Sequence, residues 1–470
     1  MRVVILDGAA VSRYNDGMKE RFKMRIAEWK KPKTWAAAIV VLALAAACVA
    51  FALWLRRPIA KYNADRDDAA QVYMTHFALA ADSNRQLFET GTVPEVYAEN
   101  NASLKTYSYA YATVVEVLSD DSHTDPETEN VHVGSQELLV EITTGAHKGR
   151  RMQLTNYMSK LFDKHASVGT SLLVFVLTDQ SHLDENGLPA LSLSVMNYNR
   201  QWLLLGLVAV FLIVVALIGK KVGLRSILGL AFTLACIVFL LVPALLRGFY
   251  AIPFTLLLCA VVTVVCFLLL DGLSRKTVSA ILGTVAGFSI ACLFAYLASR
   301  LAHLDGLEYN VAETDTLVQA KYQGTLINLR GLFVSGIIIS ALGAVMDVAM
   351  SISSSVNELK TVNPTLGFSA LLRSGMNIGR DAIGTMTNTL ILAFTGGALV
   401  NLILIKYYNW DVKAILSGDY ITHEVITGIA GSIGLILAVP LTALIASALF
   451  DRFEPGGKAA NERTARKQKQ

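Results

Sequence analysis

Apolar residues are gathered into blocks of about 20 along the chain, and these blocks hold almost no charged residue. That length matches a helix that crosses a hydrocarbon core roughly 30 Å thick. The pattern therefore predicts a polytopic α-helical membrane protein with eight transmembrane helices. The predicted helices are Trp35–Leu55, Trp202–Ile218, Ser226–Leu246, Ile252–Leu270, Val278–Leu297, Leu332–Ile352, Ile383–Leu404 and Val425–Leu449.

Basic residues flank these blocks unevenly and predict the orientation of the chain. Lysines and arginines crowd before the first block and after the last, and such residues stay on the cytoplasmic side of a membrane. We therefore expect both termini in the cytoplasm. The predicted order is a basic segment over 1–34, a first helix over 35–55, an extracytoplasmic domain over 56–200, a seven-helix membrane domain over 201–450 and a basic tail over 451–470.

Composition narrows the class of protein. Hydrophobic residues make up 54% of the chain and charged residues only 17%, whereas about a quarter of an average soluble protein is charged. A soluble enzyme and a secreted disulfide scaffold are excluded. All five cysteines fall inside predicted helices, so we expect no disulfide framework and no thiolate metal site. The sequence has no phosphate-binding loop and no dinucleotide fingerprint, and we expect neither enzymatic activity nor a cofactor.

The predicted extracytoplasmic domain begins with a helical pattern over Ala64–Arg85 and is β-rich over 105–199. Short alternating or β-branched runs separated by turn residues predict five strands. Five short strands of this kind predict a small β-barrel, similar to an OB-fold. Acidic residues outnumber basic ones in the domain, so we expect no nucleic-acid partner. The predicted strands are Ala110–Leu118, Gln136–Thr143, Arg150–Asn156, Ser171–Leu177 and Ala190–Tyr198.

Two histidines in this domain flank an acid-rich stretch. His123 and His132 lie on either side of several aspartates and glutamates, and imidazole and carboxylate groups are common ligands of divalent metals. A metal site or a proton-sensing site is one interpretation. The alternative is a solvated acidic loop.

Charged residues inside the predicted helices are few, and each is a functional hypothesis because an unpaired charge is costly in a membrane. Asp347 lies inside the predicted helix Leu332–Ile352. At helical spacing Gly343, Asp347, Ser351 and Ser354 share one face, so we expect this polar stripe to face other helices or water.

A second polar cluster opens the predicted helix Ile383–Leu404. Arg380 and Asp381 are followed by Thr385, Thr387 and Asn388 in otherwise apolar surroundings. Adjacent residues point about 100° apart on a helix, so one of the two charged groups is free to meet Asp347 from the preceding helix. A carboxylate with a partner that can move away is able to take up and release a proton, which is the chemistry of ion-coupled transport. The alternative is a static ion pair that fixes helix register.

Several short motifs are spread over the chain from about Ala110 to the C-terminus. They are Gly145-Ala146-His147-Lys148-Gly149, Asn156, Leu329-Arg330-Gly331-Leu332, Gly343–Ala349, Asn363-Pro364 and Gly379–Leu390. These motifs resemble those of the YibE/F-like family of bacterial multi-pass membrane proteins. Where family members often carry two consecutive acids, this chain has Met346-Asp347. The resemblance implies a multi-pass protein of the bacterial cell membrane.

A shorter stretch, Gly343 to Gly396, is similar to part of the SecD/SecF and RND-type membrane proteins, in which an intramembrane aspartate is followed by a cytoplasmic loop and an Asp-x-x-x-Thr helix. This similarity implies an ion-coupled transporter or export-assisting permease that uses Asp347, Arg380 and Asp381. The alternative is a membrane scaffold whose extracytoplasmic domain binds an envelope component or a protein. The lipid bilayer is the expected partner, together with a second copy or another membrane protein.

Overall fold

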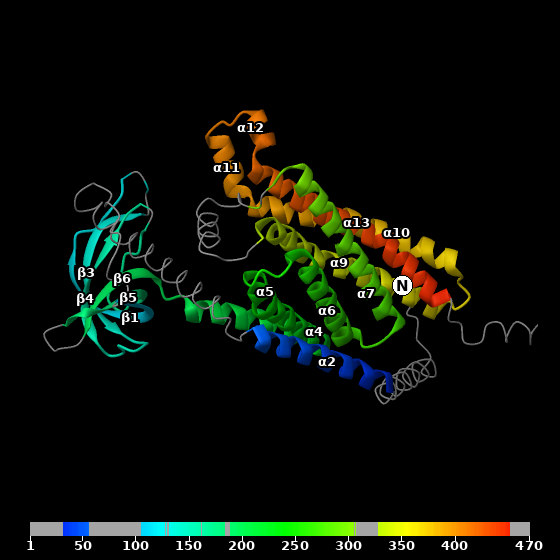
Figure 1. Ribbon diagram of the computed structural model, residues 1–470, viewed down its shortest axis with the longest axis horizontal. Coiled ribbons are helices and arrows are strands. Elements are labelled where there is room, and N and C mark those ends of the chain that lie inside the picture. Colours follow the sequence, from blue (N-terminus) through cyan, green and yellow to red (C-terminus); the bar gives the residue numbers. More distant parts are fainter. Residues whose placement is uncertain are drawn as a thin grey trace, which may run out of the picture. The chain divides into compact units, whose positions relative to one another are not determined.

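The computed structural model describes residues 32–55, 105–126, 128, 131–160, 162–183, 189–304, 306 and 328–451. They belong to two compact units, shown in Figure 1. One unit, here called the β unit, takes the described residues of 64–214. The other, the helical unit, takes those of 1–63 and 215–470.

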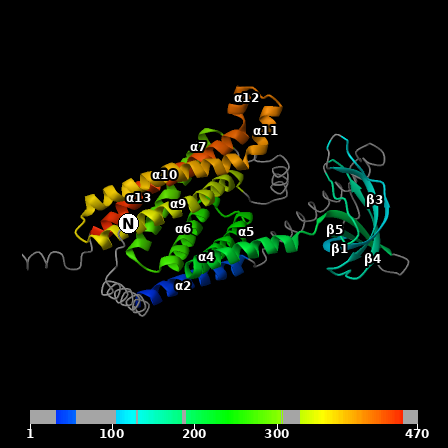
Figure 2. The same ribbon diagram turned by 180° about the vertical axis from the view of Figure 1, so that it is seen from behind.

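The β unit is an antiparallel sheet curved into a half-barrel (Figure 2). Its order is β2-β3-β1-β5-β6, and β4 pairs with β3. The long strand β1 pairs with β3 along one part and with β5 along another, and register shifts interrupt its ladder with β3. Such bulges bend and twist a strand, which lets a single strand belong to both halves of the curve. The strands are β1 Lys105–Asp120, β2 His123–Thr124, β3 His132–Ile142, β4 Arg151–Met158, β5 Ser171–Leu183 and β6 Pro189–Tyr198.

The core of the β unit comes from alternate residues of these strands. Leu138, Val140 and Ile142 on β3 are fully buried, as are Leu172 and Val174 on β5. This alternation is the period-2 signal from which the strands were predicted. All five predicted strands are confirmed, and their ends differ from the predicted ones by about six residues at most. The predicted helix over 64–85 lies outside the described residues. A closed, OB-like barrel is not shown, because no hydrogen-bonded ladder joins β4 to β6 in the described part of the sheet.

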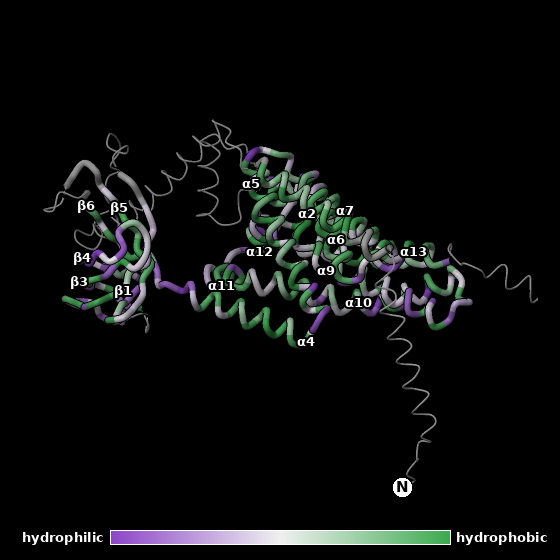
Figure 3. Tube along the Cα trace, turned by 90° about the horizontal axis from the view of Figure 1, so that it is seen from below, coloured by the Kyte–Doolittle hydropathy of each residue, from purple (hydrophilic) through white to green (hydrophobic). Residues whose placement is uncertain are grey.

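The helical unit consists of long, mainly hydrophobic helices (Figure 3). Among the described residues, five helices are long and apolar enough to cross a membrane. A sixth candidate is α10 together with α11, which bend by 57° where they meet. Within α2, Ala38–Leu53 is a shorter apolar stretch. The elements are α2 Pro32–Leu55, α4 Gln201–Cys236, η2 Ile237–Leu241, α5 Val242–Leu246, α6 Ala251–Asp271, α7 Arg275–Leu301, α9 Leu329–Val362, α10 Phe368–Gly397, α11 Leu399–Tyr407, α12 Val412–Ser417 and α13 Asp419–Asp451.

Small residues hold the centre of this unit together. A Cβ added to Gly287 of α7 would lie 2.7 Å from Val345 Cγ1 and 2.8 Å from Ala438 Cβ, and one added to Gly434 of α13 would lie 2.7 Å from Ala291 Cβ. These distances are too short for any side chain, so α7 and α13 approach closely only because both carry glycine. Close approach at small residues such as Gly287 and Gly434 is the usual way in which membrane helices associate.

Candidate ion-coupling site

The helix α9 has an inner and an outer face. Val345, Val348 and Ile352 are fully buried and pack against α10 and α13. The predicted polar stripe lies on the opposite side of the helix, as its spacing indicated. Its members Gly343, Asp347 and Ser351 are exposed on the surface of the helical unit, and Ser354 is half-buried. The stripe extends toward the start of the helix through Gly336, which is exposed, and Ser340, which is half-buried.

Nothing in the described part of the molecule covers the middle of this stripe. A Cβ on Gly336 or Gly343 would meet no atom within 4 Å. The carboxylate of Asp347 has neither a hydrogen-bond nor an ion-pair partner among the described residues. By contrast, Ser353 lies on the inner face, where it hydrogen-bonds to Ser279 and donates to the Lys276 carbonyl at 2.7 Å. Of the serines in this part of α9, Ser353 therefore has a structural role on the inner face, whereas Ser351 and Ser354 lie on the outer face, which no other described element covers.

The helix α10 shows the same division. Leu371, Gly375 and Gly379 form its buried side, and a Cβ on Gly379 would overlap Val439 Cγ1 of α13. On its outer side Arg380, Asp381, Thr385 and Asn388 are exposed. The motif that begins at Gly379 thus alternates between residues that permit close packing and residues that carry charge or hydrogen-bonding groups.

The hydroxyl groups on α10 are partly satisfied by their own helix. Thr385 donates to the Ala382 carbonyl at 3.2 Å, and Thr389 donates to the Thr385 carbonyl at 2.9 Å. Thr387 is half-buried, and its hydroxyl is without a partner among the described residues. The side chains of Arg380, Asp381 and Asn388 have no intramolecular partner in the same part of the chain. These three side chains therefore still need a hydrogen-bond or ion-pair partner.

Contacts across the two helices fix their relative level. A Cβ on Gly379 would lie 3.2 Å from Ile352 Cδ1, and one on Gly375 would lie 3.1 Å from Val356 Cγ2. In this antiparallel pair, Asp347 is level with Gly384, and Ser351 is level with Arg380. Asp381 is about one helical turn away from Asp347 along the axis. The structure brings Arg380 and Asp381 within about one turn of Asp347 along the hairpin but does not join Asp347 to either residue in an ion pair.

The turn between the two helices is well built. The side chain of Asn363 accepts hydrogen bonds from the Thr365 amide at 3.2 Å and from its hydroxyl at 2.6 Å, while Lys360 Nζ donates to the Leu366 carbonyl at 2.8 Å. These bonds account for the Asn363-Pro364 motif as a turn signal. The start of α9 is fixed similarly, because Asn328 accepts from the Gly331 amide at 2.9 Å. Both motifs therefore position the hairpin.

The two histidines suggested as metal ligands are not brought together. His123 is exposed on the short strand β2, whereas His132 Nδ1 lies 3.4 Å from Asp163 Oδ2 and its ring stacks on that of His165, with 4.6 Å between ring centroids. Within the described residues no group of three or more His, Cys, Asp or Glu side chains is arranged to hold a metal. The metal interpretation is therefore not supported, since stacked rings do not direct their nitrogens at one point.

Sequence reasoning missed a buried polar network beside this histidine pair. The fully buried Gln136 donates to Asp120 Oδ2 at 2.8 Å and to the Ala166 carbonyl at 3.1 Å, and it accepts from the Ala166 amide at 2.9 Å and from Asn156 Nδ2 at 3.3 Å. His165 Nε2 lies 3.1 Å from the same Asp120 oxygen. The sequence signal for this network was a glutamine at a strand position that points into the core, because a buried amide needs hydrogen-bond partners.

Hydrogen bonding in this network also sets the acidity of Asp120. Burial alone would raise the pKa of the carboxyl group, but hydrogen bonds from Ser122, Gln136 and His165 together outweigh it and lower the pKa to about 2. These bonds favour the ionised form of the group. Asp120 is therefore a structural carboxylate that is charged throughout the neutral and mildly acidic range.

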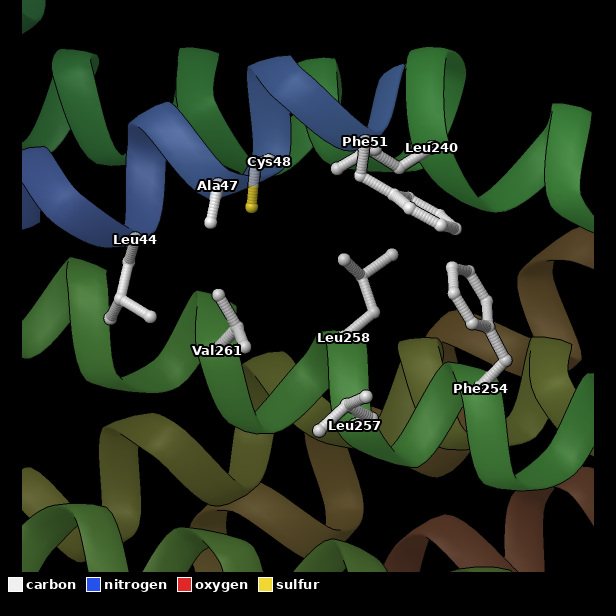
Figure 4. A pocket seen from close by; sticks show the side chains of 9 residues that line it. All are labelled: Leu44, Ala47, Cys48, Phe51, Leu240, Phe254, Leu257, Leu258 and Val261. Carbon is white, nitrogen blue, oxygen red and sulfur yellow. The ribbon is translucent and has the colours of Figure 1, made fainter. Parts of the chain in front are cut away.

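A cavity of about 220 Å³ lies between α2, η2 and α6. Figure 4 shows apolar side chains from all three elements around it, with the Cys48 thiol of α2 pointing inward. No charged residue lines it, so it suits an apolar chain and supplies no catalytic group. The lining residues are Leu44, Ala47, Cys48, Phe51, Leu240, Phe254, Leu257, Leu258 and Val261.

Comparison with known proteins gives one match. The family model described as YibE/F-like protein matches residues 207–452, which is more than half of the chain. No curated protein and no solved structure matches the chain. The similarity to SecD/SecF and RND-type proteins has no support from these comparisons and stays a prediction.

Proposed function

Because the chain belongs to the YibE/F-like family of multi-pass membrane proteins and carries an uncovered carboxylate on α9, we propose that it is an ion-coupled transporter or export-assisting permease. Asp347 is the group that binds the coupling ion, a proton or sodium. The observation that carries this proposal is the position of Asp347 on an outward polar stripe, opposite the buried face of an apolar helix.

The static ion pair loses support as an alternative. A carboxylate kept only to fix helix register would have a cation beside it, since an unpaired charge in an apolar setting costs several kcal/mol. Asp347 has no such neighbour among the described residues. Asp347 is instead level with Gly384, and Ser351 follows one turn later on the same face of α9. These small or hydroxyl-bearing residues leave room beside the carboxylate for water or an ion.

We further propose eight membrane spans. The continuous run from α4 to α5, Gln201–Leu246, has 46 residues, which would extend about 69 Å as one helix against a core of roughly 30 Å. Lys220 breaks it with a φ of 48° and a ψ of −128°. A Cβ on Gly223 would overlap the carbonyl oxygen of Val215, although eight residues separate them by about 12 Å in a straight helix. The chain therefore turns here, which favours two spans.

With this division, the described helices give the proposed count: α2, the two parts of the α4–α5 run, α6, α7, α9, α10 with α11, and α13. The turn at Lys220 also carries Lys221 and Arg225, as expected of a cytoplasmic loop. An even number of spans places both termini on the same side as this turn, and its basic residues make that side the cytoplasm. The β unit then lies outside, in a bacterial cell membrane.

Ion flux tests the proposal. The full-length protein is reconstituted in vesicles with a proton or sodium indicator inside, and a gradient is applied. We expect Asp347→Asn, which keeps the shape but removes the charge, to abolish coupled flux. Asp271→Asn is the matched control, because Asp271 pairs with Lys276 at 3.0 Å at the end of α6 and should keep flux. Unchanged flux in Asp347→Asn would refute ion coupling at this residue.

A second candidate function is a membrane scaffold, favoured by the fact that the β unit has a hydrophobic core of its own. In that case the spans only anchor the β unit. A bacterial strain that carries Asp347→Asn should then behave as wild type, whereas a strain whose protein lacks residues 105–200 should behave as a deletion. The transport proposal expects both strains to be defective.

A further inference from the structure

The outer face of α10 carries a continuous stripe of exposed residues. They recur at intervals of four, three, four, three and four residues, the spacing by which one helix presents a seam to another. All are exposed in the helical unit, and a Cβ on Gly384 at the centre would meet no atom within 4 Å. The stripe, here called the α10 seam, consists of Asn377, Asp381, Gly384, Asn388, Ile391 and Thr395.

Lipid is an unfavourable cover for this seam. Asn388 presents an amide and Asp381 a carboxylate, neither of which has a partner among the described residues. Polar groups without a partner cost several kcal/mol in hydrocarbon, whereas Asn side chains that hydrogen-bond across helices promote association. The opposite face of α10 is already buried against α13 and α9. A further helix is therefore expected on the outer side.

We propose that the seam of α10 packs against the same seam of a second copy of this chain. Two copies inserted in one membrane share their orientation, so a two-fold axis along the membrane normal relates them. Residues at equal depth then meet, as in any isologous interface. Arg380 and Asp381 are neighbours at nearly equal depth and are both exposed. The two Asp381 side chains then lie near the axis. Arg380, about 100° around the helix at nearly the same depth, flanks the seam and can reach Asp381 of the other copy from the side, which gives two reciprocal ion pairs.

The rest of the seam is also complementary to itself. An Asn side chain both donates and accepts hydrogen bonds, so Asn388 can bond to Asn388 of the second copy. Gly384 lies between the charged pair and Asn388, where the absence of a side chain lets two backbones come close. Ile391 continues the seam with an apolar contact. Charge, hydrogen bonding and size thus all match at equal depth, a match that a helix of unrelated sequence would meet only by chance.

This dimer does not depend on ion coupling. The partner's Arg380 supplies the cation that Asp381 lacks within its own chain, and Asp347 lies on the outer face of α9, not on the seam. Association between copies and flux through the protein are measured separately, so failure of one proposal leaves the other to be judged on its own result.

Disulfide cross-linking tests the proposal. Two differently tagged full-length copies are expressed together, and Gly384→Cys or Asn388→Cys is oxidised in native membranes. We expect a product that carries both tags. Met386→Cys is the matched control at the same depth, because Met386 packs toward the core and should give no such product. The parent protein is the second control, since four of its five cysteines are buried and Cys48 is half-buried.

A charge exchange tests the register of the dimer. Fluorescence energy transfer between labelled copies in lipid vesicles measures association. Arg380→Asp and Asp381→Arg should each weaken it at least tenfold, because each places like charges opposite one another. The double variant restores opposite charges and should recover most of the loss. Recovery would not occur if the two residues acted only through folding of their own chain.

Three results would count against the proposal. One is the absence of a two-tag product at both seam positions in protein that elutes as a single well-folded species. Another is a seam cysteine that cross-links within one chain, for instance to a cysteine placed at Leu207 in α4, because another helix of the same copy would then be the occupant. Association that is unaffected by either single charge change would also contradict the reciprocal ion pairs.

Discussion

Gly379 of α10 packs against Ile352 of α9, where an added Cβ would lie 3.2 Å from Ile352 Cδ1. This contact fixes how α9 and α10 are aligned along their axes. Asp347 lies at the same level as Gly384, and Ser351 at the same level as Arg380. The same glycine also meets Val439 of α13. Three helices thus converge at a residue that lies directly before the charged pair Arg380 and Asp381.

Substitution of Gly379 should therefore destabilise the hairpin. A Cβ at this position would overlap Val439 Cγ1, and overpacking of a close contact typically costs about 1–3 kcal/mol. We expect Gly379→Ala to lower the thermal unfolding midpoint of the purified protein in detergent. Gly396→Ala is the control on the same helix, because nothing lies within 4 Å of its Cβ position and it is not part of the α10 seam. Equal stability of the two variants would argue against the packing described.

The turn at Lys220 predicts a definite topology. If the α4–α5 run forms two spans, position 220 faces the cytoplasm and Gly248 the outside. A membrane-impermeant thiol reagent should label Lys220→Cys in inside-out vesicles only and Gly248→Cys in right-side-out vesicles only. Protection of Lys220→Cys on both sides would mean that this position lies within the bilayer, and the eight-span arrangement would then fail.

Loss of the Gln136 side chain should destabilise the β unit. Gln136→Leu removes four hydrogen bonds and leaves the Ala166 amide without its partner, while Asn156 keeps only its bond to the Lys164 carbonyl. We expect this loss to cost about 2–4 kcal/mol. Amide hydrogen exchange of β3 and β4 in the full-length protein measures this loss as reduced protection. Gln153→Leu should change little, because Gln153 is exposed and bonds only to Glu137.

The pKa of Asp120 gives the β unit a dependence on acid. The value of about 2 in the folded state lies below the usual value of about 3.9 for an unfolded chain. The stabilisation is therefore complete above about pH 4 and is lost as the pH falls toward 2. Exchange protection of β3, corrected for the intrinsic effect of pH, should fall in this window. Asp120→Asn should make that step smaller. What remains should come from Asp163, where burial alone would raise the pKa but hydrogen bonds from His132 and His165 outweigh it and lower the pKa. Asp121→Asn should leave the step unchanged.

Much of the fold follows from local pattern. The predicted helix Ile252–Leu270 is α6 Ala251–Asp271 with one further residue at each end, because hydropathy alone marks where a helix enters and leaves lipid. The spacing of Gly343, Asp347 and Ser351 likewise identified the outer face of α9. Periodicity is a property of a single segment. It was therefore sufficient to predict features that depend on one segment alone, such as the ends of a helix or the face that a residue occupies.

Relations between segments were not predictable. The sequence showed that Arg380 and Asp381 diverge on their helix, but not that Gly379 would dock on Ile352 and Val439 and leave both charges pointing outward. The pairing expected between Asp347 and one of these charges is absent among the described residues for that reason. The Gln136 network is similar, because Asp120, Asn156 and Ala166 are far apart in sequence and only the folded sheet brings them together.

The measurement that most directly tests the central claim is modification of Asp347 by a lipid-soluble carbodiimide, which reacts with protonated carboxyl groups in apolar surroundings. The modified residue is identified by peptide mass in membranes at several pH values and sodium concentrations. If Asp347 binds the coupling ion, it should be modified, and modification should fall as the pH rises or as sodium is added. A lack of modification at Asp347, or modification that neither pH nor sodium changes, would contradict the account.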